Sequence, residues 1–453
     1  MLASRRQEAS AVNGYHVPFA RTKSGRVPMS SAAVLPTSSR RGKLLFISQV
    51  FPFPLDRGQR VRQQNLLSAC GRAFDVTFVG PRPEDDAYRE EVDCHCARAI
   101  YLGGPPQGLR AHWHVLREAV AVAPLARSET IRMYERFVAA LQSLDLRNFD
   151  IVWAERVAVA RLFRSEEVRA RTIVDLDDIE HVKLARQLRL SPTHARPRDL
   201  WRYARYRKWE LKSSRRFLAS VVCSVEDRDY LLERGCNNAV CIPNGVVLPS
   251  NRVARRPSRS GECRPKMVFV GNVDYEPNRD AIAFFVSEIL PRVRARMPAA
   301  SFDVIGRGAT STDIARAGGT DVRFRGFVDD LSTALAEYDL MVAPIRFGSG
   351  TKLKVLDAMA HKIPLVTTTV GAEGLSIAHR KHAWVADSAE AFADGVCVLA
   401  NDGRLAANMA SSAFSLACDR FSWDAIQDRL VAWFHQLEQG STRVPTLGVS
   451  PDP

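Results

Sequence analysis

The sequence predicts an α/β protein of two domains, each built on a doubly wound parallel sheet. Three observations lead to this fold class. Short apolar runs alternate with segments of helical periodicity along the chain, which is the pattern of repeated β–α units. A stretch rich in Pro, Ser and Arg at 248–266 interrupts this alternation and predicts a linker. The length of 453 residues is sufficient for two domains of ordinary size.

A first series of strands occupies residues 43–247 and predicts the N-terminal domain. Each apolar run is followed by a helical segment, as a parallel sheet requires. Ser128 is expected to begin a long helix, because the apolar residues after it recur at helical spacing. The expected strands are 44–50, 76–80, 99–103, 149–155, 172–178, 220–225 and 239–246.

A second series occupies residues 267–420 and predicts the C-terminal domain. Its strand sequences are KMVFVGN, SFDVIGRG, VRFRGFV, YDLMVAP and IPLVTTTV. A last helix is expected at 421–440, with Ser422 as its N-cap. Residues 1–42 are rich in Ser, Arg and Ala without sustained periodicity, so we expect a disordered basic extension there. The tail at 441–453 is expected to be disordered as well.

Composition and charge narrow the class of protein. A hydrophobic content of 46% and a charged content of 25% are typical of a globular chain. The nine cysteines lack the spacing of a disulfide framework, which favours reduced thiols in the cytoplasm. No run of about 18 apolar residues predicts a membrane-spanning helix. The formal net charge of +14 comes without a nucleic-acid-binding motif, so we expect no nucleic acid partner.

The basic charge also suggests a second kind of partner, an anionic membrane surface at the inner face of the membrane. The helix expected at 198–218 interleaves Trp201, Tyr206 and Trp209 with arginines and lysines. This pattern fits an anionic lipid interface, and it fits equally an aromatic stripe buried under solvated arginines.

The most informative segment is PIRFGSGTKLKVLDAMAHKIPLVTTTVGAEGL, which begins at Pro344. It predicts a strand end, a glycine-bearing turn, a helix at about 351–361, a second strand and a second glycine-bearing turn. The glycines permit close backbone approach to a ligand, and the free N–H groups of a helix start favour an anion. Lys352 and Lys354 add positive charge, and Asp357 could accept the hydroxyls of a ribose. The alternative is an ordinary turn whose lysines face water.

Together with FVGNVDYEPN and FRGFVDDL, this segment resembles the donor-sugar site of retaining glycosyltransferases of family 4, closest to sugar transferases of bacterial exopolysaccharide clusters. The resemblance implies the GT-B fold: two Rossmann-like domains facing a cleft, with the last helix returning to the first domain. In that family a Glu-x7-Glu pair brackets the loop and helix. Here Asp357 stands at the second position and Ser349 at the first, a departure from the family pattern.

The resemblance implies roles for residues on both sides of the cleft. The donor-binding residues would be Gly58, Gly271, Asn272, Gly348, Ser349, Gly350, Thr351 and Asp357. The catalytic candidates are Lys352 and Lys354, which would stabilise the leaving diphosphate, and His181, which would contact sugar hydroxyls. The acceptor-side candidates are Arg60, Arg62, Asp177 and Asp178.

The implied reaction transfers a sugar from a nucleotide-diphosphate donor to a glycan or lipid-linked acceptor, with retention of configuration. Cationic side chains would replace a metal, and no cofactor is expected. Asp175-Leu176-Asp177 matches the DxD pattern of metal-dependent transferases, but so short a pattern is weak against the two-domain layout. Two alternatives are a nucleotide-sugar epimerase of the same architecture and a non-catalytic nucleotide-sugar-binding protein.

Overall fold

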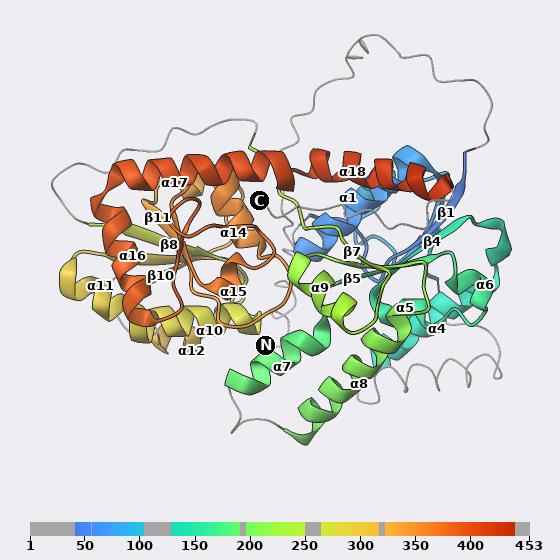
Figure 1. The fold of residues 1–453 in the computed structure, drawn as a ribbon, viewed down its shortest axis with the longest axis horizontal. Helices are drawn as coiled ribbons and strands as arrows, with labels where there is room; N and C mark the ends of the chain where they lie inside the picture. The colour runs from blue at the N-terminus through green and yellow to red at the C-terminus, as the bar shows by residue number, and fades with distance from the viewer. Residues whose placement is uncertain are drawn as a thin grey trace, which may run out of the picture.

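The computed structural model describes residues 41–55, 57–103, 128–190, 196–249, 264–316 and 322–439. Within these residues two parallel sheets lie side by side, each covered by helices, and a long helical segment at the C-terminal end runs along both (Figure 1). The predicted α/β fold class is therefore confirmed. The expected extension before residue 41, most of the linker and the tail lie outside the described residues.

The first sheet has seven described strands in the order β3-β2-β1-β4-β5-β6-β7, and every described pairing is parallel. The first strand, β1, lies inside the sheet, and later strands are added on both sides of it. Because the strands are parallel, the carboxyl ends of β1, β4, β5 and β6 lie at the same edge of the sheet. The strands are β1 (Lys43–Ile47), β2 (Asp75–Gly80), β3 (Arg98–Tyr101), β4 (Ile151–Glu155), β5 (Thr172–Asp177), β6 (Ala219–Val222) and β7 (Ala239–Cys241).

Helices cover both faces of this sheet, since alternate strand residues face opposite sides. Leu45 and Ile47 of β1 pack in one core with Phe137, whereas Leu44 and Phe46 pack in another with Leu66. The helices are α1 (Gly58–Ala73), α2 (Ala87–Asp93), α4 (Ser128–Gln142), α5 (Arg156–Ala160), α6 (Glu166–Arg169), α7 (Glu180–Leu190), α8 (Pro197–Ser214) and α9 (Val225–Glu233).

The second sheet has six described strands in the order β10-β9-β8-β11-β12-β13, again parallel throughout. Its strand ends carry the glycine turns that the sequence singles out. The strands are β8 (Lys266–Val270), β9 (Ser301–Ile305), β10 (Val322–Gly326), β11 (Leu340–Ala343), β12 (Leu365–Thr367) and β13 (Trp384–Val385).

The helices of this domain also flank the sheet on both sides (Figure 1). They are α10 (Glu276–Phe284), α11 (Leu290–Arg296), α12 (Ser311–Arg316), α13 (Leu331–Leu335), α14 (Leu353–Ala360), α15 (Thr369–Ala372), α16 (Ala389–Asn401) and α17 (Gly403–Leu416). Two five-residue π-helical segments, Phe285–Ile289 and Ala417–Phe421, continue α10 and α17.

The last helix, α18 (Trp423–Glu438), leaves the second domain and packs against α1 of the first. The Ser422 side chain caps it by accepting a hydrogen bond from the backbone N–H of Ala425, as predicted. Trp433 and Phe434 are almost fully buried in the same core as Phe46 and Trp153 of the first sheet. Among the described residues no helix combines the length and the apolar character needed to cross a membrane.

Candidate functional site

The glycine loop, FGSGT at residues 347–351, follows β11 and lies against the first domain. Gly350 has a φ of 65°, in the left-handed region that glycine tolerates best. A Cβ built on Gly350 would lie 2.1 Å from Oδ1 of Asp178 and 2.4 Å from Sγ of Cys223. These two residues follow β5 and β6, so the loop meets the carboxyl ends of the first sheet. Only glycine fits at position 350, because a Cβ would overlap both of these side chains.

Lys352 is the N-cap residue of α14 and is 8% exposed. Its ammonium group donates to the carbonyl oxygens of Ser349, at 3.3 Å, and of Gly350. The same nitrogen lies 3.7 Å from Oε2 of Glu373, in the turn after α15. The ammonium group therefore holds the loop from inside, and α14 begins two residues later than predicted because the Lys352 backbone is extended.

Lys354 is the lysine that faces a second glycine turn. Its Nζ donates to Oδ1 of Asn278 at 2.8 Å, and a Cβ built on Gly271 would lie 3.2 Å from its Cε. Burial and then repulsion from Lys352 lower the pKa of Lys354 to about 8. The structure thus joins Gly271, at the end of β8, to the first turn of α14.

The Gly271–Asn272 turn is fixed by its neighbours. The carbonyl oxygen of Asn272 accepts a hydrogen bond from Nδ2 of Asn278 at 2.7 Å. Its Oδ1 accepts from the backbone N–H of Arg307 at 3.4 Å, in the turn after β9. Turns at adjacent strand ends of an open parallel sheet form the usual ligand crevice, so this edge is a candidate phosphate site.

Three polar groups near the loop have no hydrogen-bond partner among the described residues. Oγ of Ser349 and Oγ1 of Thr351 are buried without one. The carboxylate of Asp357 lies one turn into α14 and also makes no hydrogen bond to a described residue. Burial raises the pKa of Asp357 to about 6, against the opposing influence of His361 and Lys354. Unpaired polar atoms at such a place are ready to bind a polar ligand.

The first domain contributes the start of α1. A Cβ built on Gly58 would lie 2.1 Å from Cδ1 of Leu353, so this end of α1 touches the first residue of α14. Arg60 forms an ion pair with Glu84 at 2.9 Å, and its side chain is 15% exposed. These positions place the first turn of α1 beside the candidate phosphate site.

Arg62 requires a correction. It is 1% exposed, and its guanidinium group donates to both oxygens of Asp175, at 2.8 and 3.1 Å. It also donates to the carbonyl oxygen of Ile242 and to Oδ1 of Asn244, both at 3.0 Å. Because its hydrogen bonds are made inside the first domain, Arg62 does not face an acceptor.

His181 also requires a correction, since it is 1% exposed and lies in an internal network. Its Nδ1 lies 2.6 Å from Oε2 of Glu210, and its Nε2 lies 2.7 Å from the hydroxyl of Tyr230. Both ring nitrogens are therefore engaged within the first domain, and neither is left for a sugar hydroxyl. His181 therefore links α7 to Glu210 of α8 and to Tyr230 of α9.

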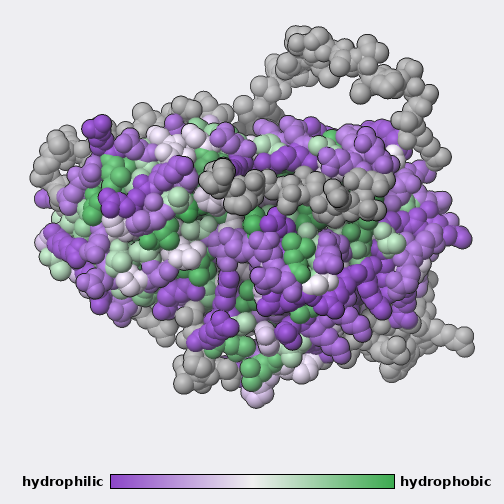
Figure 2. All heavy atoms as spheres, viewed as in Figure 1, coloured by the Kyte–Doolittle hydropathy of each residue, from purple (hydrophilic) through white to green (hydrophobic). Residues whose placement is uncertain are grey.

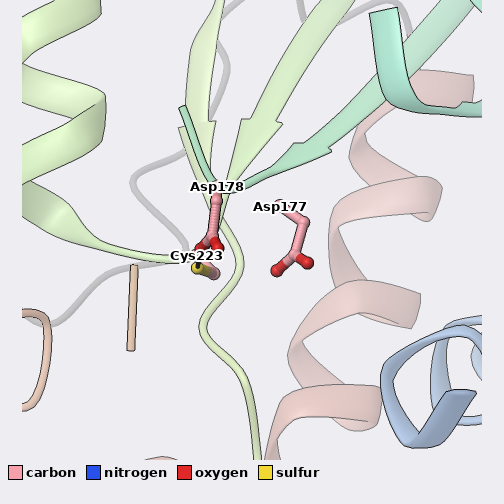
Figure 3. A group of neighbouring side chains, drawn as sticks. All are labelled: Asp177, Asp178 and Cys223. Carbon is pink, nitrogen blue, oxygen red and sulfur yellow. Dashed lines mark hydrogen bonds between the residues drawn. The ribbon is translucent and has the colours of Figure 1, made fainter. Parts of the chain in front are cut away.

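Asp177 is the last residue of β5 and Asp178 follows it; in Figure 3 the Asp178 side chain lies at Cys223, with that of Asp177 to one side. The Asp178 carboxylate accepts a weak hydrogen bond from the Cys223 thiol at 3.5 Å, and burial raises its pKa to about 6. Burial alone would raise the pKa of Asp177, but the charges of Arg156 and Arg62 lower it. Asp178 is therefore the acidic residue that meets the glycine loop.

Asp177, Asp178 and Cys223 offer three atoms within 4.8 Å of one another, a spacing that could hold a metal ion. Members of this group also have other partners in the first domain. Arg156 binds Asp177 at 3.0 Å, and burial raises the pKa of the Cys223 thiol. The DxD pattern likewise has its acids paired with arginines.

The sequence does not reveal the contacts made by Arg186, Glu226 and Glu373. All three lie where the domains meet, and their partners are far apart in the chain. The VGAEGL motif draws attention to the turn that contains Glu373, but the sequence contains no signal for its pairing with an arginine of α7.

Two facing parallel α/β domains with glycine turns at the strand ends define the GT-B class of fold, and solved structures agree. A sucrose-phosphate synthase from Thermosynechococcus elongatus superposes with a TM-score of 0.63 at 17% identity, covering 88% of this chain and 100% of that one. Anabaena Alr3699/HepE in complex with UDP and glucose gives 0.59 at 16% identity, covering 87% and 99%.

Sequence comparison adds a family for part of the chain. Residues 264–402 match the family model described as glycosyl transferases group 1. A 44.6 kDa protein of the cps region of Klebsiella pneumoniae is 20% identical over 375 residues, which are 78% of this chain and 89% of that protein. The family match covers the Gly271 turn, the glycine loop and α14.

Proposed function

We propose that this protein is a retaining glycosyltransferase of family 4. It moves a sugar from a nucleotide-diphosphate donor to a glycan or lipid-linked acceptor during assembly of a surface polysaccharide, at the cytoplasmic face of the membrane. One observation carries the proposal: the group 1 glycosyltransferase match covers the residues in which Lys354, the Gly271 turn and the glycine loop come together. The UDP and glucose bound to the Anabaena neighbour support a donor of this type.

The donor is oriented by the polar groups of the second domain. The diphosphate lies at the Gly271 turn and the start of α14, where Lys354 and backbone N–H groups meet an anion. The ribose hydroxyls donate to Asp357, whose carboxylate is otherwise without a hydrogen bond among the described residues. The sugar then points toward the first domain, where Asp178 touches the glycine loop.

The reaction is a front-face substitution in which the leaving diphosphate helps to accept the acceptor's proton. Negative charge grows on that diphosphate as the bond to the sugar breaks, so a fixed lysine stabilises the transition state more than the ground state. Lys354 supplies this charge, and Lys352 holds the shape of the loop. Close contact between the domains excludes water, which would otherwise hydrolyse the donor.

A membrane surface is the proposed location of the acceptor. Leu200 and Trp201, at the start of α8, are 54% and 41% exposed. Arg198 and Arg202 beside them have side chains about half exposed. Figure 2 shows a small hydrophobic area among hydrophilic residues at the lower edge of the molecule. In Figure 1 the N-terminal end of α8 lies at this place. Exposed apolar residues beside cations are suited to anionic lipid.

The proposed function is tested by incubating the protein with UDP-, GDP-, ADP- and dTDP-sugars, after a thermal-shift screen has selected those that bind. Release of the nucleoside diphosphate is measured with and without lipid-linked acceptors. Acceptor-dependent release with retention of configuration supports the proposal. Interconversion of the donor sugar without an acceptor would instead identify an epimerase, and binding without turnover a non-catalytic protein.

A further inference from the structure

An arginine of the first domain binds the turn after α15 in the second domain. Arg186 of α7 donates to both carboxylate oxygens of Glu373, Nη1 to Oε2 and Nη2 to Oε1, each at 2.6 Å. Its Nη1 also donates to the carbonyl oxygen of Gly348 at 2.6 Å. The two side chains are 28% and 12% exposed. A bidentate pair of this kind fixes both distance and orientation.

The same carboxylate reaches the lysine inside the glycine loop. Oε2 of Glu373, which accepts from Arg186, lies 3.7 Å from Nζ of Lys352. Lys352 in turn donates to the carbonyl oxygens of Ser349 and Gly350. A continuous chain of charged contacts therefore runs from α7 of the first domain to the backbone of the loop in the second.

A second contact from the first domain reaches the adjacent residue. Oε1 of Glu226, at the start of α9, accepts a hydrogen bond from the backbone N–H of Gly374 at 3.1 Å. Glu373 and Gly374 are thus each held by a different helix of the first domain. The turn after α15 therefore contacts two helices of the first domain and, through Glu373, the lysine at the glycine loop.

We propose that Glu373 is a positioning residue, which sets Lys352 and the glycine loop in their working geometry when Arg186 docks. The inference rests on the proposed function and adds a rule to it: the donor site is complete only when the first domain is in contact. Without Arg186 the competent arrangement is populated less, and the apparent affinity for donor falls in proportion.

A neighbouring contact provides a matched control. Gln187 follows Arg186 on α7 and also crosses to the second domain, where its Nε2 donates to Oε2 of Glu276 at 2.8 Å. This bond is exposed and touches neither the glycine loop nor its lysine. If contact between the domains alone mattered, Gln187→Ala would act as Arg186→Gln does.

The kinetic test compares Arg186→Gln, Glu373→Gln, their double variant and Gln187→Ala, all as full-length protein. We expect Arg186→Gln to raise the KM for donor roughly tenfold, a typical coupling between sites. Glu373→Gln should raise that KM at least as much and should also lower kcat up to about a hundredfold, because a small displacement of the loop is costly in catalysis. The double variant should be no worse than Glu373→Gln alone, and Gln187→Ala should be unchanged. Independent, multiplying effects would overturn the proposal.

A second measurement is independent of turnover and separates this inference from the proposed function. Hydrogen exchange of the backbone amides of 346–356 should be faster in Arg186→Gln and in Glu373→Gln than in the wild type and in Gln187→Ala. Unchanged exchange there in folded variants rejects the coupling. A wild type that transfers no sugar rejects the proposed function, while the exchange experiment still decides whether Arg186 and Glu373 set the loop.

Discussion

Lys354 carries a charge that depends on pH in a useful range, since its pKa is lowered to about 8. Below pH 8 the ammonium form is available to a diphosphate, and above it the lysine becomes neutral. We expect the affinity for UDP to fall as pH rises, by roughly tenfold for each unit above the pKa. Isothermal titration of UDP between pH 7 and pH 9.5 measures this.

Lys354→Arg provides the control for this prediction, because a guanidinium group stays charged over the whole range. Its affinity for UDP should change little with pH. An equally steep dependence in the arginine variant would place the titrating group elsewhere.

Asp357 should hold the ribose of the donor. A hydrogen bond to a charged group is worth about 1.5–3 kcal/mol, so Asp357→Ala should weaken UDP binding roughly ten- to a hundredfold. Asp357→Asn keeps the shape of the side chain and one acceptor oxygen, so its loss should be smaller. Calorimetric titration of the folded variants gives both values. Equal affinity in wild type and Asp357→Ala would remove the ribose assignment.

At the scale of elements, α8 can be tested as a membrane-binding helix. Replacing both Leu200 and Trp201 by serine should abolish flotation with vesicles containing anionic lipid, because their apolar side chains are exposed and available for insertion. Ile314→Ser is the matched control, since Ile314 is 53% exposed on α12 of the other domain.

Two outcomes of the flotation experiment would contradict the membrane interface. The first is equal binding of the wild type to neutral and anionic vesicles, which would show that the arginines beside Trp201 contribute nothing. The second is unchanged flotation of the serine variant, which would place the contact on another surface.

The strands and helices could be predicted from local patterns, but several of their ends could not. The strand that begins at Ala239 ends at Cys241, because Pro243 cannot donate a ladder hydrogen bond. The expected run to 246 follows the apolar pattern past that residue. The helix after the glycine loop begins at Leu353 because the backbone of Lys352 is extended, which depends on contacts with Glu373 and the loop.

The candidate site was predictable only where chemistry and sequence spacing coincide. Gly271, Gly350 and Lys354 are marked by turns at strand ends, and the structure brings them to one edge. The expectation that Arg62 faces the acceptor fails because its partner, Asp175, lies 113 residues away in the chain. Nothing in the local sequence of an arginine on a helix shows that an aspartate of another strand will bury it.

For the whole molecule, α18 is the element that links the two halves. Deleting 423–453 should expose the apolar face that contains Phe46 and Trp153, so we expect loss of cooperative unfolding of the first domain. Trp433→Ala is the milder form, with an expected loss of about 3–5 kcal/mol. Thermal and denaturant unfolding measure both. A deletion of 440–453 alone should leave the unfolding transition unchanged.

A truncated chain with a wild-type transition would show that α18 is not needed to complete that core. Equal loss of stability in both domains would instead mean that they unfold as one unit, because α18 would then act through the junction between them and not through the packing of Trp433.

Because α18 packs on the first domain, the two domains are completed in a fixed order during synthesis. The described strands of the first domain are all synthesised by Cys241, but Trp433 and Phe434, which close its core, are synthesised only after the second sheet. At about 5–20 residues per second the wait lasts on the order of 10 to 40 s. The second sheet and its helices are continuous from Lys266 to Leu416 and can form during this interval. The first domain is thus completed after the second domain, and until α18 is synthesised the apolar face that holds Phe46 and Trp153 stays uncovered by Trp433 and Phe434.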